Sequence, residues 1–153
     1  MSSRLFQEIR ERRGRAYTVY SFQSSYCDAG YTGVYVGTSA EWAREVVDVI
    51  RAELERVRRE GLAAEELGRV KNQMKGNIVL GLETSDSRMS RIAKNEIYFG
   101  RDVPLEEVAA AVDAVTNDDI LRVAGRLFRP GTLALTILGD LKEHTLDAGV
   151  LAG

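Results

Sequence analysis

The sequence predicts an α+β fold in which helices pack on one face of a small, mostly antiparallel sheet. Two stretches with a period of two, residues 16–22 and 31–38, are joined by a short loop that contains Gly30. This arrangement is typical of an antiparallel hairpin. After the hairpin, apolar residues recur every three or four positions in several successive segments, which is the pattern of amphipathic helices.

The composition is that of an ordinary globular domain. The chain has 153 residues, of which 44% are hydrophobic and 29% charged, and its formal net charge is −2. One domain is therefore expected, and neither nucleic acid nor a membrane is expected as a partner. The single cysteine, Cys27, excludes an internal disulfide and fits a reducing compartment, so a cytoplasmic location is expected.

The first segment reads as a short helix, a glycine stop and a strand. Ser2 or Ser3 can accept a hydrogen bond from the first turn, and Gly14 stands where a helix usually ends. Arg10 lies one turn beyond Phe6, at the border of the apolar face, and Tyr17 enters the strand just after the turn. The fold can therefore bring one guanidinium and one phenol together.

The second strand leads into the helix with the clearest amphipathic pattern. Gly33 and Gly37 would weaken that strand, so a close contact is expected on their face of the sheet. Thr38 and Glu41 have the spacing of a capping box. The helix that follows carries an apolar stripe from Trp42 onward and is expected to stop at Gly61.

Four more helices are expected in the rest of the chain. They begin near Ala63, near Ser87, at Pro104 and after Thr116, whose spacing to Asp119 predicts an acid-backed cap. The apolar segment 132–138 then predicts a strand buried in the sheet. The segment from residue 142 is weakly patterned and is expected to be a loose tail.

Several segments together resemble the second-half domain of the M16 family of zinc metallopeptidases, the group of mitochondrial processing peptidase, pitrilysin and insulysin. The resemblance covers nearly the whole chain. The matching segments are SSRLFQEIRERRGRAY at 2–17, EELGRVKNQMKGNIVLGLE at 65–83, SRMSRIAKNEIYFGR at 87–101, AVTNDDILRVA at 114–124 and LALTILGD at 133–140.

The resemblance implies a substrate-binding role for Arg10 and Tyr17. In that family, an arginine in this helix and a tyrosine seven positions later help to bind the substrate near the zinc, and these two residues match them. The implied function is that of a non-zinc domain that holds an extended peptide and lends both residues to a zinc site on another domain or subunit. The implied partners are a peptide substrate and that zinc-bearing domain or subunit.

The resemblance also implies domain limits. Family domains carry a further strand and helix before the segment at residue 2, so residues 1–141 are expected to be a domain truncated at its N-terminus, followed by the loose tail 142–153. The missing strand should leave an apolar slot for a partner chain, and a homo-oligomer is expected.

A zinc site is not expected within this chain. The family motif His-x-x-Glu-His needs two histidines, whereas the sequence has one, His144. No catalytic residue and no metal ligand are therefore expected here, and the chain should not hydrolyse peptides alone. Zinc is expected in the complete enzyme.

Simpler interpretations remain open. Arg10 could form a surface ion pair with Glu8 or Glu11, and Tyr17 could be half-buried packing. The arginines between residues 10 and 15 look like a basic patch, but acidic residues dilute it and no aromatic residues alternate with it, which disfavours nucleic acid. The alternative function is a non-catalytic partner or scaffold subunit of an M16-like complex.

Overall fold

The computed structural model describes residues 3–129, 131–144 and 146–151. By internal packing the chain divides into two compact units. Unit 1 consists of residues 1–59 and 124–153, and unit 2 consists of residues 60–123. The single domain expected over residues 1–141 stays a prediction.

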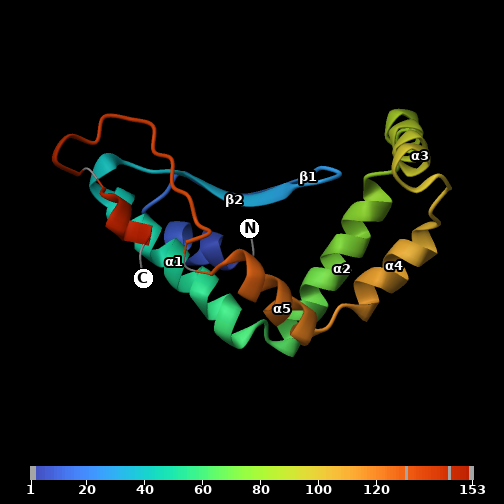
Figure 1. Ribbon diagram of the computed structural model, residues 1–153, viewed down its shortest axis with the longest axis horizontal. Helices are drawn as coiled ribbons and strands as arrows, with labels where there is room; N and C mark the ends of the chain where they lie inside the picture. Colours follow the sequence, from blue (N-terminus) through green and yellow to red (C-terminus); the bar gives the residue numbers. More distant parts are fainter. Residues whose placement is uncertain (1–2, 130, 145, 152–153) are drawn as a thin grey trace. The chain divides into compact units, whose positions relative to one another are not determined.

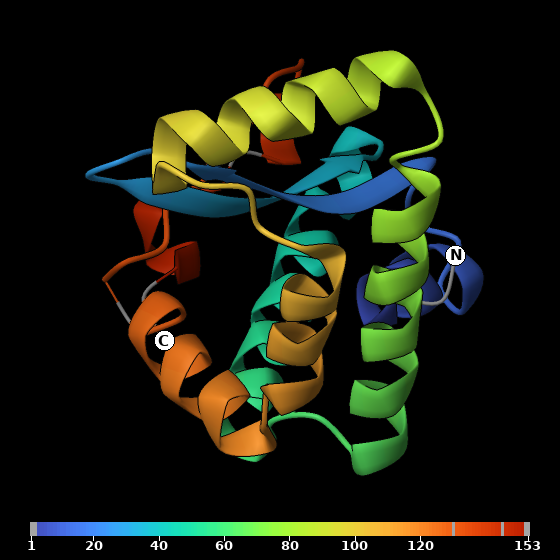
Figure 2. The same ribbon diagram turned by 90° about the vertical axis from the view of Figure 1, so that its right-hand side faces the viewer.

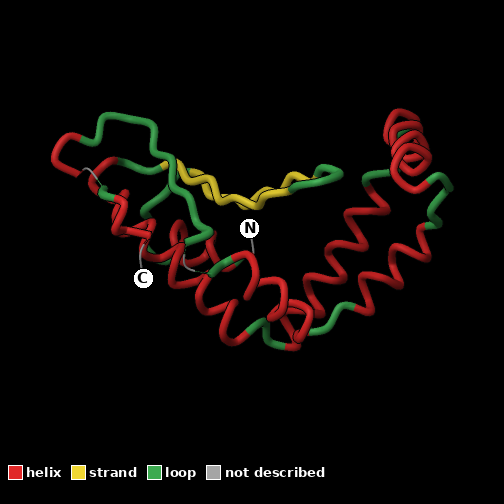
Figure 3. Tube along the Cα trace, in the orientation of Figure 1, coloured by secondary structure: helices red, strands yellow, loops and turns green. Residues whose placement is uncertain are grey.

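The sheet of unit 1 is a two-stranded antiparallel hairpin. Strand β1 is Thr18–Ser25 and strand β2 is Gly30–Gly37, and the two run side by side in Figures 1 and 3. Their register pairs Tyr20 with Tyr35 at the middle of the ladder. The turn is closed by the Tyr26 N–H, which donates to the Ala29 carbonyl at 2.8 Å. The hairpin predicted from the period of two is confirmed.

One face of the hairpin carries the core of unit 1. Val19 is buried together with Ile9, from the opening helix, and Val46, from the long helix. The opening helix η1 is Phe6–Glu11 and the long helix α1 is Ala43–Glu60. Both helices lie on the same side of the hairpin in Figure 1. The expected arrangement, helices on one face of a small sheet, is confirmed for this unit.

The opposite face of the hairpin is aromatic. The Tyr20 and Tyr35 rings stack with their centroids 5.1 Å apart, and Phe22 meets Tyr31 edge-on at 6.1 Å. A Cβ atom at Gly33 would lie 2.6 Å from the Phe22 ring. The predicted close contact is thus found at Gly33, whereas at Gly37 the nearest atom, Thr18 Cβ, lies at an ordinary 3.9 Å.

The predicted capping box before α1 is wrong. The hydroxyl of Thr38 donates to the Arg15 carbonyl instead of accepting from the first turn of the helix. A short 3-10 turn, η2 at Ala40–Trp42, precedes α1 and has Ser39 at its cap position. The sequence pattern could not show this, because the acceptor that Thr38 binds lies 23 positions away.

The predicted third strand is also wrong. Residues 132–138 form no strand, and the Leu138 side chain is fully exposed. A strand needs a neighbour to receive its backbone hydrogen bonds, and β1 and β2 pair only with each other among the described residues. An apolar run therefore does not suffice to form a strand here.

The last segment of unit 1 has an anchor that its weak pattern did not indicate. It contains two short 3-10 turns, η3 at Lys142–His144 and η4 at Ala148–Leu151. Val150 is only 1% exposed. The Arg51 guanidinium, on α1, donates to the Val150 carbonyl at 2.6 Å.

Unit 2 is helical. Its helices are α2 (Ala64–Leu80), α3 (Ser85–Phe99), α4 (Leu105–Ala114) and the first part of α5 (Asn117–Leu127). Helices α2 and α4 lie side by side in Figure 2. They are joined by the ammonium groups of Lys71 and Lys75, which donate to the Asp113 carbonyl at 2.8 Å and to its carboxylate at 2.7 Å.

The helix stops predicted at Gly61, which follows α1, and at Gly100, which follows α3, are confirmed. Gly61 and Gly100 have positive φ angles of 68° and 64°, as helix stops of this kind require. Thr84 caps α3 by accepting from the Ser87 N–H at 3.2 Å. In the part of the chain that the structure describes, no helix has the length and apolar character needed to cross a bilayer.

Candidate functional site

Arg10 projects from the outer side of η1. The helix has the wide π form, in which the Arg12 N–H donates to the Gln7 carbonyl at 2.9 Å. Such π segments are rare and occur frequently at functional sites. Ile9 is fully buried, whereas the next residue, Arg10, is exposed. The Arg10 guanidinium lies over the Phe6 ring, 5.0 Å from its centroid.

The ion pair that was the simpler interpretation of Arg10 does not form. Glu8 instead bonds Arg12 at 2.5 Å and lies 3.9 Å from Arg13. No carboxylate within residues 3–129, 131–144 and 146–151 pairs with Arg10. The guanidinium therefore keeps its hydrogen-bond donors available to a ligand.

Tyr17 stands at the entrance to the hairpin. Its backbone N–H donates to the Gly37 carbonyl at 2.9 Å, which ties it to the end of β2. Its side chain is 80% exposed, so it is not the half-buried packing residue of the simpler interpretation. A phenol can both donate and accept a hydrogen bond, and this one is open to a ligand.

The two residues flank one core contact. Arg10 directly follows Ile9, and Tyr17 precedes Val19 by two positions; Ile9 and Val19 belong to the same buried cluster. Gly14, with a φ angle of 63°, turns the chain between them. The backbone positions of Arg10 and Tyr17 are thus held to one packed region of unit 1.

Arg15 connects this turn to its surroundings. Its guanidinium lies over the Trp42 ring, 3.5 Å from the centroid, and its Nε donates to the Glu45 carboxylate at 3.1 Å. Its backbone N–H donates to the Ile9 carbonyl at 2.9 Å. Sequence reasoning grouped Arg15 with the other arginines as a basic patch, and no signal within the local sequence distinguishes it, because its side-chain partners lie about 30 positions away.

The residues that the structure describes do not fit a zinc ion. Among the described residues, no group of three or more His, Cys, Asp or Glu side chains could hold a metal. The single histidine of the sequence, His144, lies 4.0 Å from Glu143, and Cys27 is exposed in the hairpin turn. No step of a mechanism is therefore assigned to a metal held by these residues.

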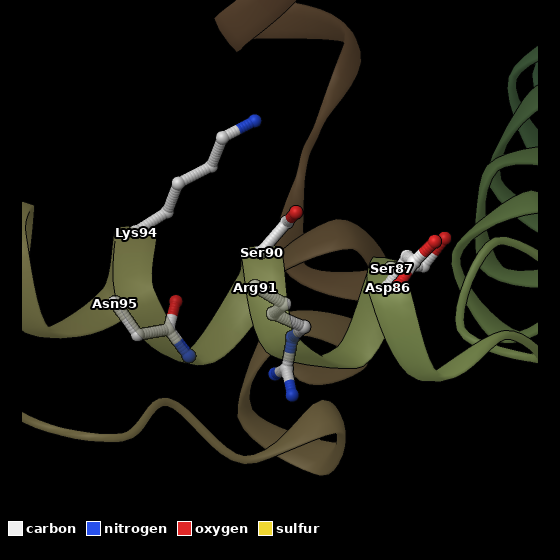
Figure 4. A pocket seen from close by; sticks show the side chains of 6 residues that line it. All are labelled: Asp86, Ser87, Ser90, Arg91, Lys94 and Asn95. Carbon is white, nitrogen blue, oxygen red and sulfur yellow. The ribbon is translucent and has the colours of Figure 1, made fainter.

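Two open depressions do not offer a better site. The one on α3, of about 460 Å³, is shown in Figure 4, where Ser90 and Lys94 point to one side of the helix and Arg91 and Asn95 to the other. The last two bind the following loop: Arg91 donates to the Val103 carbonyl and Asn95 to the Asp102 carboxylate. The lining residues are Asp86, Ser87, Ser90, Arg91, Lys94 and Asn95.

The second depression, of about 640 Å³, lies along the start of α1. Two of its carboxylates are engaged in ion pairs: Asp48 bonds Arg44 at 3.1 Å within the lining, and Glu45 bonds Arg15, which lies outside it. In the depression on α3, the Ser87 hydroxyl accepts a hydrogen bond from the Thr84 hydroxyl at 2.9 Å. The exposed pair Arg10 and Tyr17 remains the strongest candidate for ligand contact.

Comparisons with known proteins agree on one family. The family described as "Peptidase M16 inactive domain" matches residues 1–74. Uncharacterized zinc proteases of Streptomyces coelicolor and Bacillus subtilis are each 41% identical to the chain, over 94% and 84% of its length. An uncharacterized zinc protease of Mycobacterium tuberculosis is 40% identical over 83% of the chain.

A solved structure supports the same fold. The crystal structure of a conserved protein from Enterococcus faecalis matches 81% of this chain with a TM-score of 0.70 and 28% identity, and the match covers 29% of that protein. The chain likewise spans only 29–31% of the length of the three zinc proteases.

Proposed function

Because this chain belongs to the M16 peptidase family, as a domain of its C-terminal, non-zinc type, we propose that it holds an extended peptide and presents Arg10 and Tyr17 to it. The relatives are named zinc proteases, so zinc belongs to the complete enzyme in this proposal. The zinc site then lies on another domain or subunit, which is the partner of this chain.

The observation that carries the proposal is the availability of both side chains. Arg10 has no carboxylate partner among the described residues, and Tyr17 is 80% exposed. A guanidinium and a phenol can each donate a hydrogen bond to a peptide carbonyl. Donors fixed in advance toward the oxygen that gains negative charge lower the barrier of acyl transfer. Arg10 directly follows buried Ile9, and Tyr17 lies two positions before buried Val19, so both groups are attached to the core of unit 1.

The hairpin supplies a surface for the peptide backbone. Each of its two strands has one edge without a neighbouring strand in the described part of the chain. An extended peptide can add to such an edge through main-chain hydrogen bonds, largely independently of its sequence. Tyr17 lies at the start of β1, so a peptide on this strand would run past the phenol.

The other proposed partner is a second copy of this chain, which would cover the remaining strand edge. Its test is the oligomeric state in solution. The cytoplasmic location expected from the single cysteine stays a prediction.

The test combines this chain with the zinc-bearing domain or subunit and measures hydrolysis of a quenched-fluorescence peptide. Tyr17→Phe removes only the hydroxyl, and Arg10→Ala removes the guanidinium. We expect each change to raise the transition-state free energy by about 2–4 kcal/mol, the range found for a lost oxyanion donor. The loss should appear mainly in kcat, since these donors act on the charge that develops during the reaction.

Two matched controls come from the same unit. Tyr26→Phe changes an exposed phenol in the hairpin turn, and Arg13→Ala changes an exposed arginine three positions after Arg10. Both should retain full activity. If Tyr17→Phe and Arg10→Ala also retain it, the proposal is wrong, and the chain is a non-catalytic partner or scaffold subunit.

A further inference from the structure

Arg15 bonds to three elements that surround the Arg10–Tyr17 turn. Its backbone N–H binds the carbonyl of Ile9, which is the residue before Arg10. Its backbone carbonyl accepts from the hydroxyl of Thr38, just after β2. Its side chain reaches the start of α1. One residue thus connects the end of η1, the end of β2 and the long helix.

The side-chain contacts need the shape of a guanidinium. The group is flat, so it can lie 3.5 Å over the Trp42 ring and still donate from Nε to Glu45 at 3.1 Å. An ammonium group is a compact point charge and cannot make both contacts with the same geometry. Because the Arg15 side chain is about one third exposed, these contacts are partly withdrawn from water.

The same contacts define the position of Tyr17. The backbone of Arg15 is hydrogen-bonded to the Ile9 carbonyl and to the Thr38 hydroxyl. Two residues later, the Tyr17 N–H donates to the Gly37 carbonyl. The short segment between these points leaves the phenol little freedom to shift as a whole. A shift of this segment would move Tyr17 relative to Arg10, because the other end of the turn is held by buried Ile9.

We propose that Arg15 is a positioning residue: stacked on Trp42 and paired with Glu45, it holds the turn so that Tyr17 and Arg10 present their donors to the same peptide. This inference rests on the proposed function of Tyr17. It differs from a purely stabilising role, because it predicts that Arg15 affects catalysis through the placement of Tyr17 relative to Arg10, and so has little effect once the Tyr17 hydroxyl is removed.

The experiment is a double-mutant cycle in the assembled, zinc-loaded enzyme. Arg15→Gln should lower kcat about 10- to 100-fold with little change in KM, because a displacement near 1 Å can cost this much. In the Tyr17→Phe background, the same change should lower kcat less than about threefold, since residues that act as a unit are not additive. Arg13→Gln is the matched control and should leave kcat unchanged.

Two further measurements separate positioning from folding and from substrate binding. Arg15→Lys and Glu45→Gln keep part of the contact, so each should lower kcat by less than Arg15→Gln does. They replace Arg15→Gln in the experiment if that variant does not fold. The affinity of the metal-free assembly for the labelled peptide, followed by fluorescence anisotropy, should change less than about threefold in Arg15→Gln, because the residue does not touch the peptide.

The possible outcomes distinguish a failure of the positioning role of Arg15 from a failure of the proposed function of Tyr17. Losses that multiply in the double variant, or a loss of peptide affinity as large as the loss in kcat, would overturn the positioning role while Tyr17 kept its function. If Tyr17→Phe alone leaves kcat unchanged, the proposed function of Tyr17 fails and the role of Arg15 fails with it.

Discussion

Four arginines lie within six positions, and their surroundings give them different roles. Arg10 stacks on Phe6 and keeps its donors available, whereas Arg12 is bound by Glu8. Arg13 has only a contact of 3.9 Å to the same carboxylate. Arg15 is held by an aromatic ring and a carboxylate from α1. The chemistry of a side chain is thus fixed by its nearest partners rather than by its type.

Gly61 is the residue with the strictest steric requirement. Its φ angle is 68°, and a Cβ atom would lie 2.2 Å from the side-chain oxygen of Asn117. That oxygen accepts the Leu62 N–H at 2.8 Å. Any side chain at position 61 would therefore strain the backbone and displace the Asn117 amide from its hydrogen bond.

We predict that Gly61→Ala destabilises the fold more than Gly100→Ala does. Gly100 has a similar φ angle but no atom within 4 Å of its Cβ position, so only the backbone strain of about 1–2 kcal/mol applies there. Gly61→Ala should lose about 1 kcal/mol more, for the displaced hydrogen bond. Urea unfolding of both variants measures the difference, and equal losses would contradict the prediction.

The capping box of α5 shows how four consecutive residues can set a helix end. The Asp119 carboxylate accepts from the Thr116 N–H at 3.0 Å and from its hydroxyl at 2.8 Å, while the Asp119 N–H donates back to that hydroxyl at 3.2 Å. The backbone hydrogen bond from Thr116 lowers the pKa of Asp119 most, followed by the Thr116 hydroxyl and Arg122, to about 2.

This depressed pKa predicts how the start of α5 responds to acid. The unfolded group titrates near 3.8 and the folded group near 2, so the cap stabilises the helix fully above the unfolded value. The stabilisation falls between these two values and is lost as the pH drops through about 2. In Asp119→Asn, this contribution to the pH dependence should vanish. The free energy of unfolding, measured from pH 7 to pH 2, compares the unchanged chain with Asp119→Asn. If the two curves of free energy against pH run parallel, the pH dependence does not come from Asp119.

Distant parts of the sequence meet within unit 1. Arg51 on α1 donates to the carbonyl of Val150, 99 positions later, and the Val150 side chain is buried. The first 59 residues therefore share a unit with the last 30. The looseness expected of the segment 142–153 stays a prediction, and the contact at Val150 provides a test of it.

We predict that Val150→Ala lowers the free energy of unfolding by about 1.5 kcal/mol, since it removes buried hydrocarbon worth about 0.8 kcal/mol per carbon. The matched control is Leu138→Ala, at a fully exposed apolar residue of the same unit. This change should alter the free energy of unfolding by less than about 0.5 kcal/mol. Thermal and urea unfolding provide both values. If Val150→Ala has no larger effect than Leu138→Ala, the tail is loose as its pattern indicated.

The sequence by itself determined the features that depend on neighbours a few positions apart. These are the hairpin, the helix stops at Gly61 and Gly100, the acid-backed cap at Thr116 and the family to which the chain belongs. The roles of Arg10 and Tyr17, which the family resemblance implies, stay predictions.

Only the tertiary structure decided the features that depend on distant partners. In the folded chain, the Thr38 hydroxyl binds the Arg15 carbonyl instead of capping a helix, and the Arg15 side chain binds Trp42 and Glu45. Among the described residues, the apolar segment 132–138 has no strand to pair with. The physical reason is that a local pattern states what a residue can bind, while the packing of segments far apart in the sequence decides which partner is within reach.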